Sequence, residues 1–277
     1  MRKLHSILWP AVIAMMMLMA SSAFAGSVTE QGETLGLALG APLPEGVYFA
    51  DTSSYISRSN KPDISAVVNI PTLVWSTPWK LFGGRIEGYT AVPEDMLTVE
   101  GHQSSGFYNI PLLIGEAWDV GDGLGVSNFV GGYSPMNTGG LATDNWVFND
   151  RAAVTYKVDG WSITAHSIYG YVGKDIHTNQ QDTPDYFNYD LSATKSLGKW
   201  SLGPVAYGSH DLSGLGSGYK KQSQFAMGGF VGYNFGPIDW QCYVTHDVDQ
   251  TGYTGEDTRV FMRVIVPLGN PLNWFLG

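Results

Sequence analysis

The sequence predicts an all-β protein, a transmembrane antiparallel up-and-down β-barrel of about 12 strands. Three observations predict this fold: long segments of alternating apolar and polar residues, connections that are alternately short and long, and tryptophans clustered beside the short connections. With 35 Gly, 13% aromatic and only 14% charged residues, the composition is unusual for a soluble domain of this size. A soluble β-sandwich or propeller is the alternative, but we find no repeat of regular period typical of a propeller.

The alternation is clearest in the last third of the chain, residues 186–268. Most alternate positions of residues 223–235 are apolar, and the pattern resumes after the turn at Gly236-Pro237. Such a period of two indicates strands with one apolar and one polar face. Each run is about ten residues long, which is enough for a tilted strand to cross a bilayer.

The connections between the predicted strands are alternately short and long. Long, polar connections are expected at residues 92–104, 134–149 and 174–185, among others. Outer-membrane barrels combine short periplasmic turns with longer external loops, so the long connections are expected outside the cell. The short connections are predicted near Thr77-Pro78, Gly121-Asp122, Asp159-Gly160, Gly198-Lys199 and Gly236-Pro237.

Tryptophan supports the same arrangement, because most tryptophans lie within a few residues of a short connection. Clustering at one end of the strands predicts an aromatic girdle at one membrane interface. The predicted girdle consists of Trp75, Trp79, Trp118, Trp161, Trp200 and Trp240.

Residues 1–25 are predicted to be a signal peptide. An apolar stretch follows Arg2 and Lys3, and Ala23-Phe24-Ala25 is a small-residue cleavage site, so the cut is expected between Ala25 and Gly26. Its removal leaves 13 Lys and Arg against 25 Asp and Glu, a net charge of −12, which argues against a nucleic-acid partner. We therefore expect export to the bacterial outer membrane, with membrane lipid as a partner.

The remaining chain divides into three parts. Residues 26–45 are rich in Gly and Pro and form an extended segment, either a flexible periplasmic tail or a segment folded into the barrel mouth. Residues 46–268 are the predicted barrel, and residues 269–277 are a C-terminal extension.

The position of each residue in the alternation predicts which side chains face the barrel interior. Apolar sets such as Ile64, Val68, Ile70 and Val74 are expected to face lipid, and Glu116 breaks the rule because it shares that face of its strand with apolar residues. A charge facing lipid at mid-membrane costs about 2–4 kcal/mol for Lys or Arg, so charged residues should face the lumen. The predicted lumen residues are Arg85, Glu87, Arg151, Lys157, His166, Asp190, Asp239, Tyr243, Asp247, Arg259 and Arg263.

Several short motifs together resemble the outer-membrane β-barrel family of the meta-pathway of phenol degradation. The motifs are PLPEGVYF at 42–49, VGGYSP at 130–135, NWVF at 145–148, YDL at 189–191, WSLG at 200–203, GFVGYNF at 229–235 and RVFMRVIVPL at 259–268. The resemblance implies an outer-membrane barrel that carries small, often aromatic or apolar, compounds passively. The chain departs from the usual barrel end, because residues 269–277 continue past the closing strand.

Two other functions stay open at this point. His102 and Ser104 have a spacing that places both side chains on one strand face, as a lipid-hydrolysing barrel would need, but the spacing identifies no third residue to orient the histidine. A structural or adhesive barrel acting through its loops is the other alternative. No metal-ligand or cofactor motif is present, so we expect a channel or carrier without cofactor or metal and not an enzyme. The identity of the solute and the oligomeric state stay open.

Overall fold

The computed structural model describes residues 27–60 and 62–270. The predicted signal peptide, the Ala25–Gly26 junction and most of the C-terminal extension lie outside the described residues. Within the part described, no helix is long and apolar enough to span a membrane.

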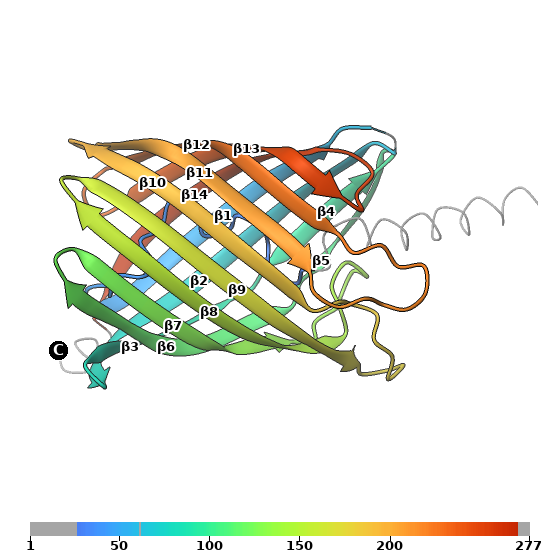
Figure 1. Cartoon of the computed structure of the whole chain (residues 1–277), viewed down its shortest axis with the longest axis horizontal. Helices are drawn as coiled ribbons and strands as arrows, with labels where there is room; N and C mark the ends of the chain where they lie inside the picture. Colours follow the sequence, from blue (N-terminus) through green and yellow to red (C-terminus); the bar gives the residue numbers. More distant parts are fainter. Residues whose placement is uncertain (1–26, 61, 271–277) are drawn as a thin grey trace, which may run out of the picture.

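The chain forms one closed antiparallel sheet, and Figure 1 shows its strands running obliquely around a barrel. The sheet closes where β1 pairs with both β2 and β14. The strands are β1 (Gly46–Arg58), β2 (Ile64–Leu81), β3 (Gly84–Ala91), β4 (Glu94–Val99), β5 (His102–Phe107), β6 (Ile110–Gly121), β7 (Leu124–Ser134), β8 (Asn145–Val158), β9 (Trp161–Asp175), β10 (Tyr186–Leu197), β11 (Trp200–Asp211), β12 (Ser223–Asn234), β13 (Asp239–Thr251) and β14 (Asp257–Gly269).

The fourteen strand segments occupy twelve positions around the barrel, as predicted. One part of β2 pairs with β3 and the other part with β4, so β3 and β4 follow one another in a single position. β6 pairs with β3, and β5 pairs with β4, so β5 and β6 share the next position. Pro93 lies in the first interruption and Asn109 in the second. A proline has no N–H for the strand ladder, which accounts for the first break.

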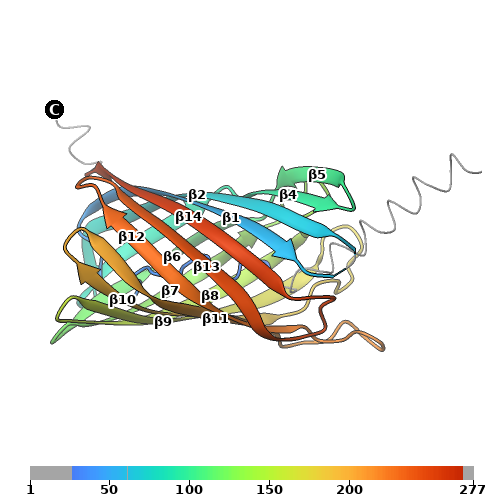
Figure 2. The same ribbon diagram turned by 90° about the horizontal axis from the view of Figure 1, so that it is seen from above.

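The hairpin of β4 and β5 corrects the expected long loop at residues 92–104. The strands continue through this region and turn at Glu100-Gly101, where both residues have positive φ. Figure 2 shows this hairpin at the end of the barrel that carries the longer loops. Because these strands lie near the barrel rim, their sequence is polar and contains glycine, a composition that is also typical of loops.

The short turns lie together at the opposite end of the barrel (Figure 1). Asp122-Gly123 and Asp159-Gly160 have positive φ at both residues, as a type I′ hairpin requires. The turn predicted at Thr77-Pro78 is wrong, because β2 continues to Leu81 and turns at Phe82-Gly83. The register shifts between Ser76 and Lys80, so the proline sits in a bulge instead of a turn.

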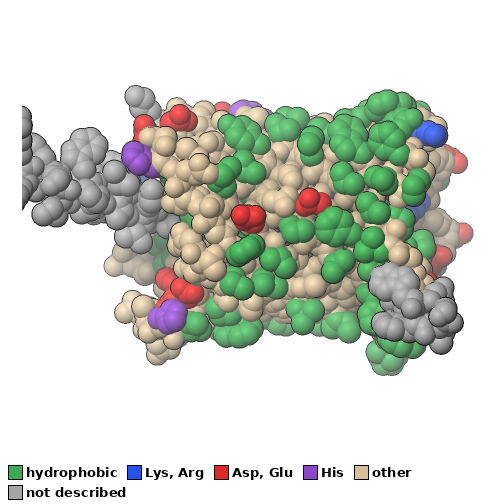
Figure 3. All heavy atoms as spheres, turned by 180° about the vertical axis from the view of Figure 1, so that it is seen from behind, with side chains coloured by type: hydrophobic (Ala, Val, Ile, Leu, Met, Phe, Trp, Pro, Cys, Tyr) green, Lys and Arg blue, Asp and Glu red, His purple; other side chains and the backbone are tan. Residues whose placement is uncertain are grey.

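Most exposed large side chains on the barrel wall are apolar, and Figure 3 shows them spread over the outer face between its two ends. Leu112 and Ile114 are 70% and 60% exposed, as expected for a lipid-facing surface. Glu116 lies on this same outer side of β6, two residues from Trp118 of the predicted girdle, and no register shift turns it inward.

The predicted facing of β2 is wrong. Ile64, Val68 and Ile70 are buried inside the barrel and Val74 lines the cavity, whereas residues of the other face of the strand, such as Leu73, point outward. Both faces of β2 carry apolar residues, so alternation alone could not decide which face meets lipid. The pairing decides it, because Ile70 lies opposite Thr52, a buried residue of β1.

Candidate functional site

The barrel interior contains the beginning of the described chain. Residues 27–45, the inner segment, run inside the barrel toward the end with the short turns, where β1 begins (Figures 1 and 2). The segment contacts the wall along its length: Ser27 accepts a hydrogen bond from Asn188, and the Leu43 amide donates to Glu87 over 2.8 Å. These contacts place it within the lumen.

Close packing also fixes the inner segment. Gly36 has a φ of +81°, and a Cβ there would lie 2.3 Å from the Phe230 ring. Gly40 passes so near the wall that a Cβ would lie 2.4 Å from the backbone nitrogen of Thr155. Only glycine therefore fits at positions 36 and 40, because any side chain there would displace the barrel wall.

Three buried arginines of the wall bind the inner segment. Arg151 of β8 donates to the Glu33 carboxylate over 2.7 Å. Arg259 of β14 contacts Glu30 at 3.0 Å and the side-chain oxygen of Gln31 at 2.8 Å. Buried arginine needs such charge-assisted hydrogen bonds, because an unpaired buried charge is costly.

Arg263, also on β14, binds the segment through backbone carbonyls. It donates to the Leu35 carbonyl over 2.9 Å and to the Glu33 carbonyl. The Tyr243 hydroxyl accepts a hydrogen bond from Arg263 over 2.8 Å and itself donates to the Gly32 carbonyl. The backbone of the inner segment is thus hydrogen-bonded to β13 and β14.

On the facing wall, Thr34 links two of the predicted lumen residues. Its hydroxyl donates to Asp190 over 2.6 Å and lies 2.9 Å from Nδ1 of His166. All three therefore form one contact between the inner segment, β9 and β10. Both wall residues are buried.

The other predicted lumen residues do not share one site. Asp247 is buried and accepts hydrogen bonds from Gln224, whereas Asp239 accepts one from Asn234 beside a short turn. Lys157 lines the cavity near another short turn, and Arg85 donates to the Thr77 carbonyl. The charged residues of the lumen therefore make separate contacts and do not form one cluster.

A cavity of about 730 Å³ lies between the inner segment and part of the wall. One side of it is apolar and is formed by Ala66, Val68, Ile70, Ala91 and Leu97. These five residues belong to a larger buried cluster, and we call that whole cluster the apolar wall. Its residues belong to β1, β2, β3 and β4, and Leu141 of the loop after β7 packs against them. The residues of the apolar wall are Ile56, Ile64, Ala66, Val68, Ile70, Ala91, Leu97 and Val99.

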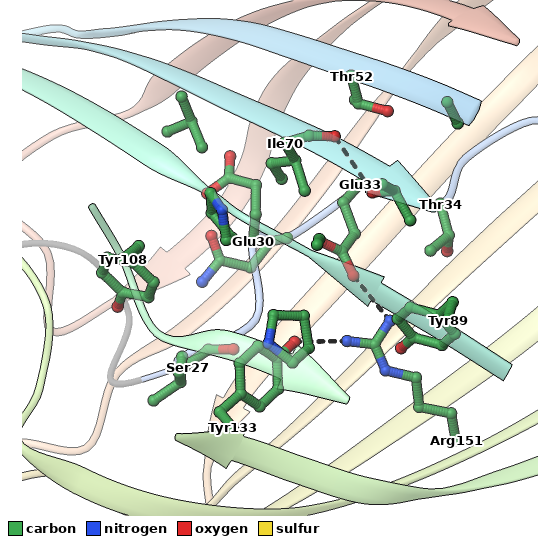
Figure 4. A pocket seen from close by; sticks show the side chains of 18 of the residues that line it. Ser27, Glu30, Glu33, Thr34, Thr52, Ile70, Tyr89, Tyr108, Tyr133 and Arg151 are labelled. Atoms are coloured by element: carbon green, nitrogen blue, oxygen red, sulfur yellow. Dashed lines mark hydrogen bonds and ion pairs between the residues drawn. The ribbon is translucent and has the colours of Figure 1, made fainter. Parts of the chain in front are cut away.

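The opposite side of the cavity is polar and aromatic. Figure 4 shows Tyr108, Tyr133, Glu30 and Arg151 facing the same space as Ile70 of the apolar wall. In the loop before β12, Tyr219 also lines the cavity and donates a hydrogen bond to Asp211. Burial, together with this neighbouring carboxylate, raises the pKa of Tyr219, so its hydroxyl stays protonated near neutral pH.

Sequence reasoning missed the apolar wall and two polar residues beside it, Asp95 and Tyr108. Asp95 lies in the stretch expected to be a loop, and the alternation that Tyr108 shares with Ile110, Leu112 and Ile114 predicts that it faces lipid. Tyr108 sits in the break between β5 and β6, which turns its ring toward the cavity. No sequence pattern marks this break, because it depends on pairing with β3 and β4.

The tryptophans of the predicted girdle stay near the short turns. Trp79, Trp161 and Trp200 are exposed, and Trp200 packs edge-on against Tyr233 at 4.7 Å between ring centres. Trp75 and Trp79 pack edge-on at 5.4 Å. Trp118 and Trp240 are half-buried.

His102 and Ser104 lie two residues apart on β5, at the barrel end with the long loops. Among the residues described, no group of three His, Cys, Asp or Glu side chains is placed to hold a metal ion.

Comparisons with known proteins agree with this architecture. The family model described as "Putative MetA-pathway of phenol degradation" matches residues 47–264. An outer membrane channel from Pseudomonas putida F1 is similar in structure, with a TM-score of 0.69 and 12% identity over 86% of this chain and 99% of that one.

Two further solved structures share the barrel. The NanC porin has a TM-score of 0.50 and 12% identity over 79% of this chain and 100% of that one. The translocator domain of the autotransporter NalP from Neisseria meningitidis has a TM-score of 0.50 and 12% identity over 95% of this chain and 97% of that one. No curated protein matches the sequence.

Proposed function

We propose a function from two premises: the chain belongs to the phenol-degradation family whose model it matches, and its barrel encloses a cavity with an apolar wall. The proposed function is passive passage of small apolar or aromatic compounds across the bacterial outer membrane. The observation that carries it is the apolar wall, because a channel for water-soluble solutes has a polar interior.

The dimensions of the cavity support the proposal. A volume of about 730 Å³ falls in the range of pockets that enclose small organic molecules. The inner segment occupies part of the remaining lumen, where it is hydrogen-bonded to β13 and β14. A compound that leaves water for the apolar wall gains about 25 cal/mol per Å² of buried apolar surface.

Structural likeness supports a channel. The Pseudomonas putida F1 protein is described as an outer membrane channel, and nearly all of it aligns with this barrel. For this chain we propose the same placement, with a signal peptide cleaved after Ala25, the short turns in the periplasm and the longer loops outside.

Uptake by intact cells tests the proposal. A Gram-negative host with few porins would be supplied with naphthalene or with glucose, with and without this barrel in its outer membrane. The barrel should accelerate naphthalene uptake and leave glucose uptake unchanged. Acceleration of glucose alone would contradict the proposal and indicate a polar channel.

A further inference from the structure

Charges around the cavity are unbalanced. Seven acidic side chains line it, but only Arg151, Lys157 and Arg263 bring positive charge. Two of the acids form ion pairs with arginine: Glu33 with Arg151, and Glu30 with Arg259. The other five lack such a partner among the described residues.

Four of these five carboxylates are satisfied by neutral donors. Glu87 accepts from the Leu43 amide, and Asp175 accepts from the amide of His177 over 2.9 Å. Asp144 and Asp182 accept hydrogen bonds from asparagine side chains. Asp95 is different, because within residues 27–60 and 62–270 its side chain has no hydrogen bond and no ion pair.

Asp95 points into the cavity. It lies opposite Val68 in the pairing of β2 with β4, and Val68 belongs to the apolar wall. Its neighbour Glu94 lies opposite Asn69 and is exposed on the outside of the barrel. Asp95 therefore places a carboxyl group with no positively charged partner beside Leu97 and Val68 of the apolar wall.

An aromatic ring faces the same space. Tyr108 lines the cavity, and its hydroxyl has no hydrogen-bond partner among the residues described. The face of an aromatic ring attracts cations, most strongly where water is excluded. By contrast, the Tyr89 ring already carries Arg151 at 5.4 Å from its centre.

We propose that Asp95 and Tyr108 form a binding subsite for the ammonium group of a small hydrophobic amine, whose apolar body packs on Val68, Ile70 and Leu97. A carboxylate in apolar surroundings is costly unless it is paired. A neutral solute leaves Asp95 unpaired, whereas an ammonium group supplies both the opposite charge and hydrogen-bond donors. This inference rests on the proposed function and adds a solute class to it.

Direct binding tests the subsite without relying on transport. The folded barrel in phosphatidylcholine nanodiscs would be titrated calorimetrically with 2-phenylethylammonium and with 2-phenylethanol, a neutral compound of similar size, and empty nanodiscs would serve as the blank. We expect the ammonium compound to bind about tenfold more tightly than the alcohol, because one charge-assisted hydrogen bond contributes about that much affinity.

Variants test which residues cause the tighter binding of the ammonium compound. Asp95→Asn should weaken ammonium binding about tenfold and leave the alcohol unchanged. Glu94→Gln, the matched control on the outer face, should change neither. Tyr108→Leu should weaken ammonium binding about threefold, and Tyr108→Phe should retain it, because the ring attracts the cation. Heat-dependent gel mobility would show that each variant is folded.

The outcomes separate this inference from the proposed function. If the alcohol binds and the ammonium compound gains nothing, the subsite is overturned while an apolar solute site stands. If neither compound binds, the subsite is overturned, and naphthalene uptake by cells then decides the proposed function. An equal loss in Asp95→Asn and Glu94→Gln would also overturn the subsite.

Discussion

Arg151 and Glu33 join the barrel wall to the inner segment: the guanidinium of β8 lies 2.7 Å from the carboxylate, and both side chains are largely buried. Arg151 also donates to Asn149 over 2.7 Å and to Tyr133 over 2.6 Å, so contacts within the wall help to hold its position. The inner segment is therefore anchored to a buried charge that the wall also holds.

Breaking this pair should destabilise the barrel. Glu33→Gln leaves the Arg151 charge buried without its counter-charge, and removal of one partner of a buried pair costs about 3 kcal/mol. Unfolding by denaturant in lipid vesicles measures the loss. Glu45→Gln, an exposed residue at the end of the same segment, serves as the control and should change stability little. Equal stability of both variants would show that the pair does not anchor the segment.

The double variant Arg259→Ala with Arg263→Ala should open the lumen. It removes the hydrogen bonds to Glu30, Gln31 and the Leu35 carbonyl, and it leaves the acidic residues in excess. Conductance in planar bilayers should therefore rise, and ion preference should shift toward cations. Lys80→Ala, an exposed residue near a short turn, is the control. Unchanged conductance and selectivity would show that the two arginines do not limit the path.

The sequence predicts the barrel well because its strands obey local rules. Apolar and polar faces alternate, and Asp-Gly turns require positive φ, so both features can be read without knowing the pairing. The site could be predicted only in part. The sequence places charged residues such as Arg151 and Arg259 in the interior because lipid excludes charge. Their partners in the inner segment could not be identified, since nothing local brings residue 33 to residue 151.

The apolar wall shows why the rest could not be predicted. On β2 both faces are apolar, with Val68 inside and Val67 outside, so the alternation that separates lumen from lipid elsewhere is missing. Asp95 and Tyr108 lie beside breaks between strands, and the direction in which each side chain points there depends on strand pairing. The features that distinguish this lumen from a polar channel are therefore the ones with the weakest sequence signal.

Processing of the chain gives a direct prediction. N-terminal sequencing of the protein recovered from an outer-membrane fraction should begin at Gly26, because Ala23-Phe24-Ala25 has the small residues that signal peptidase requires. Substitution of Ala25 by a bulky residue, Ala25→Leu, should cause the precursor to accumulate. Recovery of the mature chain as a soluble periplasmic protein would contradict the proposed location.

Protease added to intact cells should test the orientation. The connections at residues 135–144 and 176–185 are long and lie at one end, whereas Asp159-Gly160 is a tight turn at the other. Cleavage is therefore expected in the long loops, with the turn protected inside the periplasm. The same protease recognition site would be inserted at each position, so that cleavage depends on accessibility and not on the local sequence. Cleavage at the Asp159-Gly160 insertion alone would invert the orientation.

The apolar wall itself can be tested with a polar substitution that nearly conserves volume. Val68 is 5% exposed and belongs to the wall, so Val68→Asn places an amide where an apolar solute would pack. Burying an unpaired amide against a solute costs about 1–3 kcal/mol, which corresponds to roughly a tenfold slower naphthalene uptake in the whole-cell assay. Val67→Asn, one residue along β2 and on the outer face, provides the matched control. Its effect should be confined to stability in the membrane, with uptake per folded molecule unchanged. If both substitutions slowed uptake equally, or if only Val67→Asn did, the solute path would not follow the apolar wall.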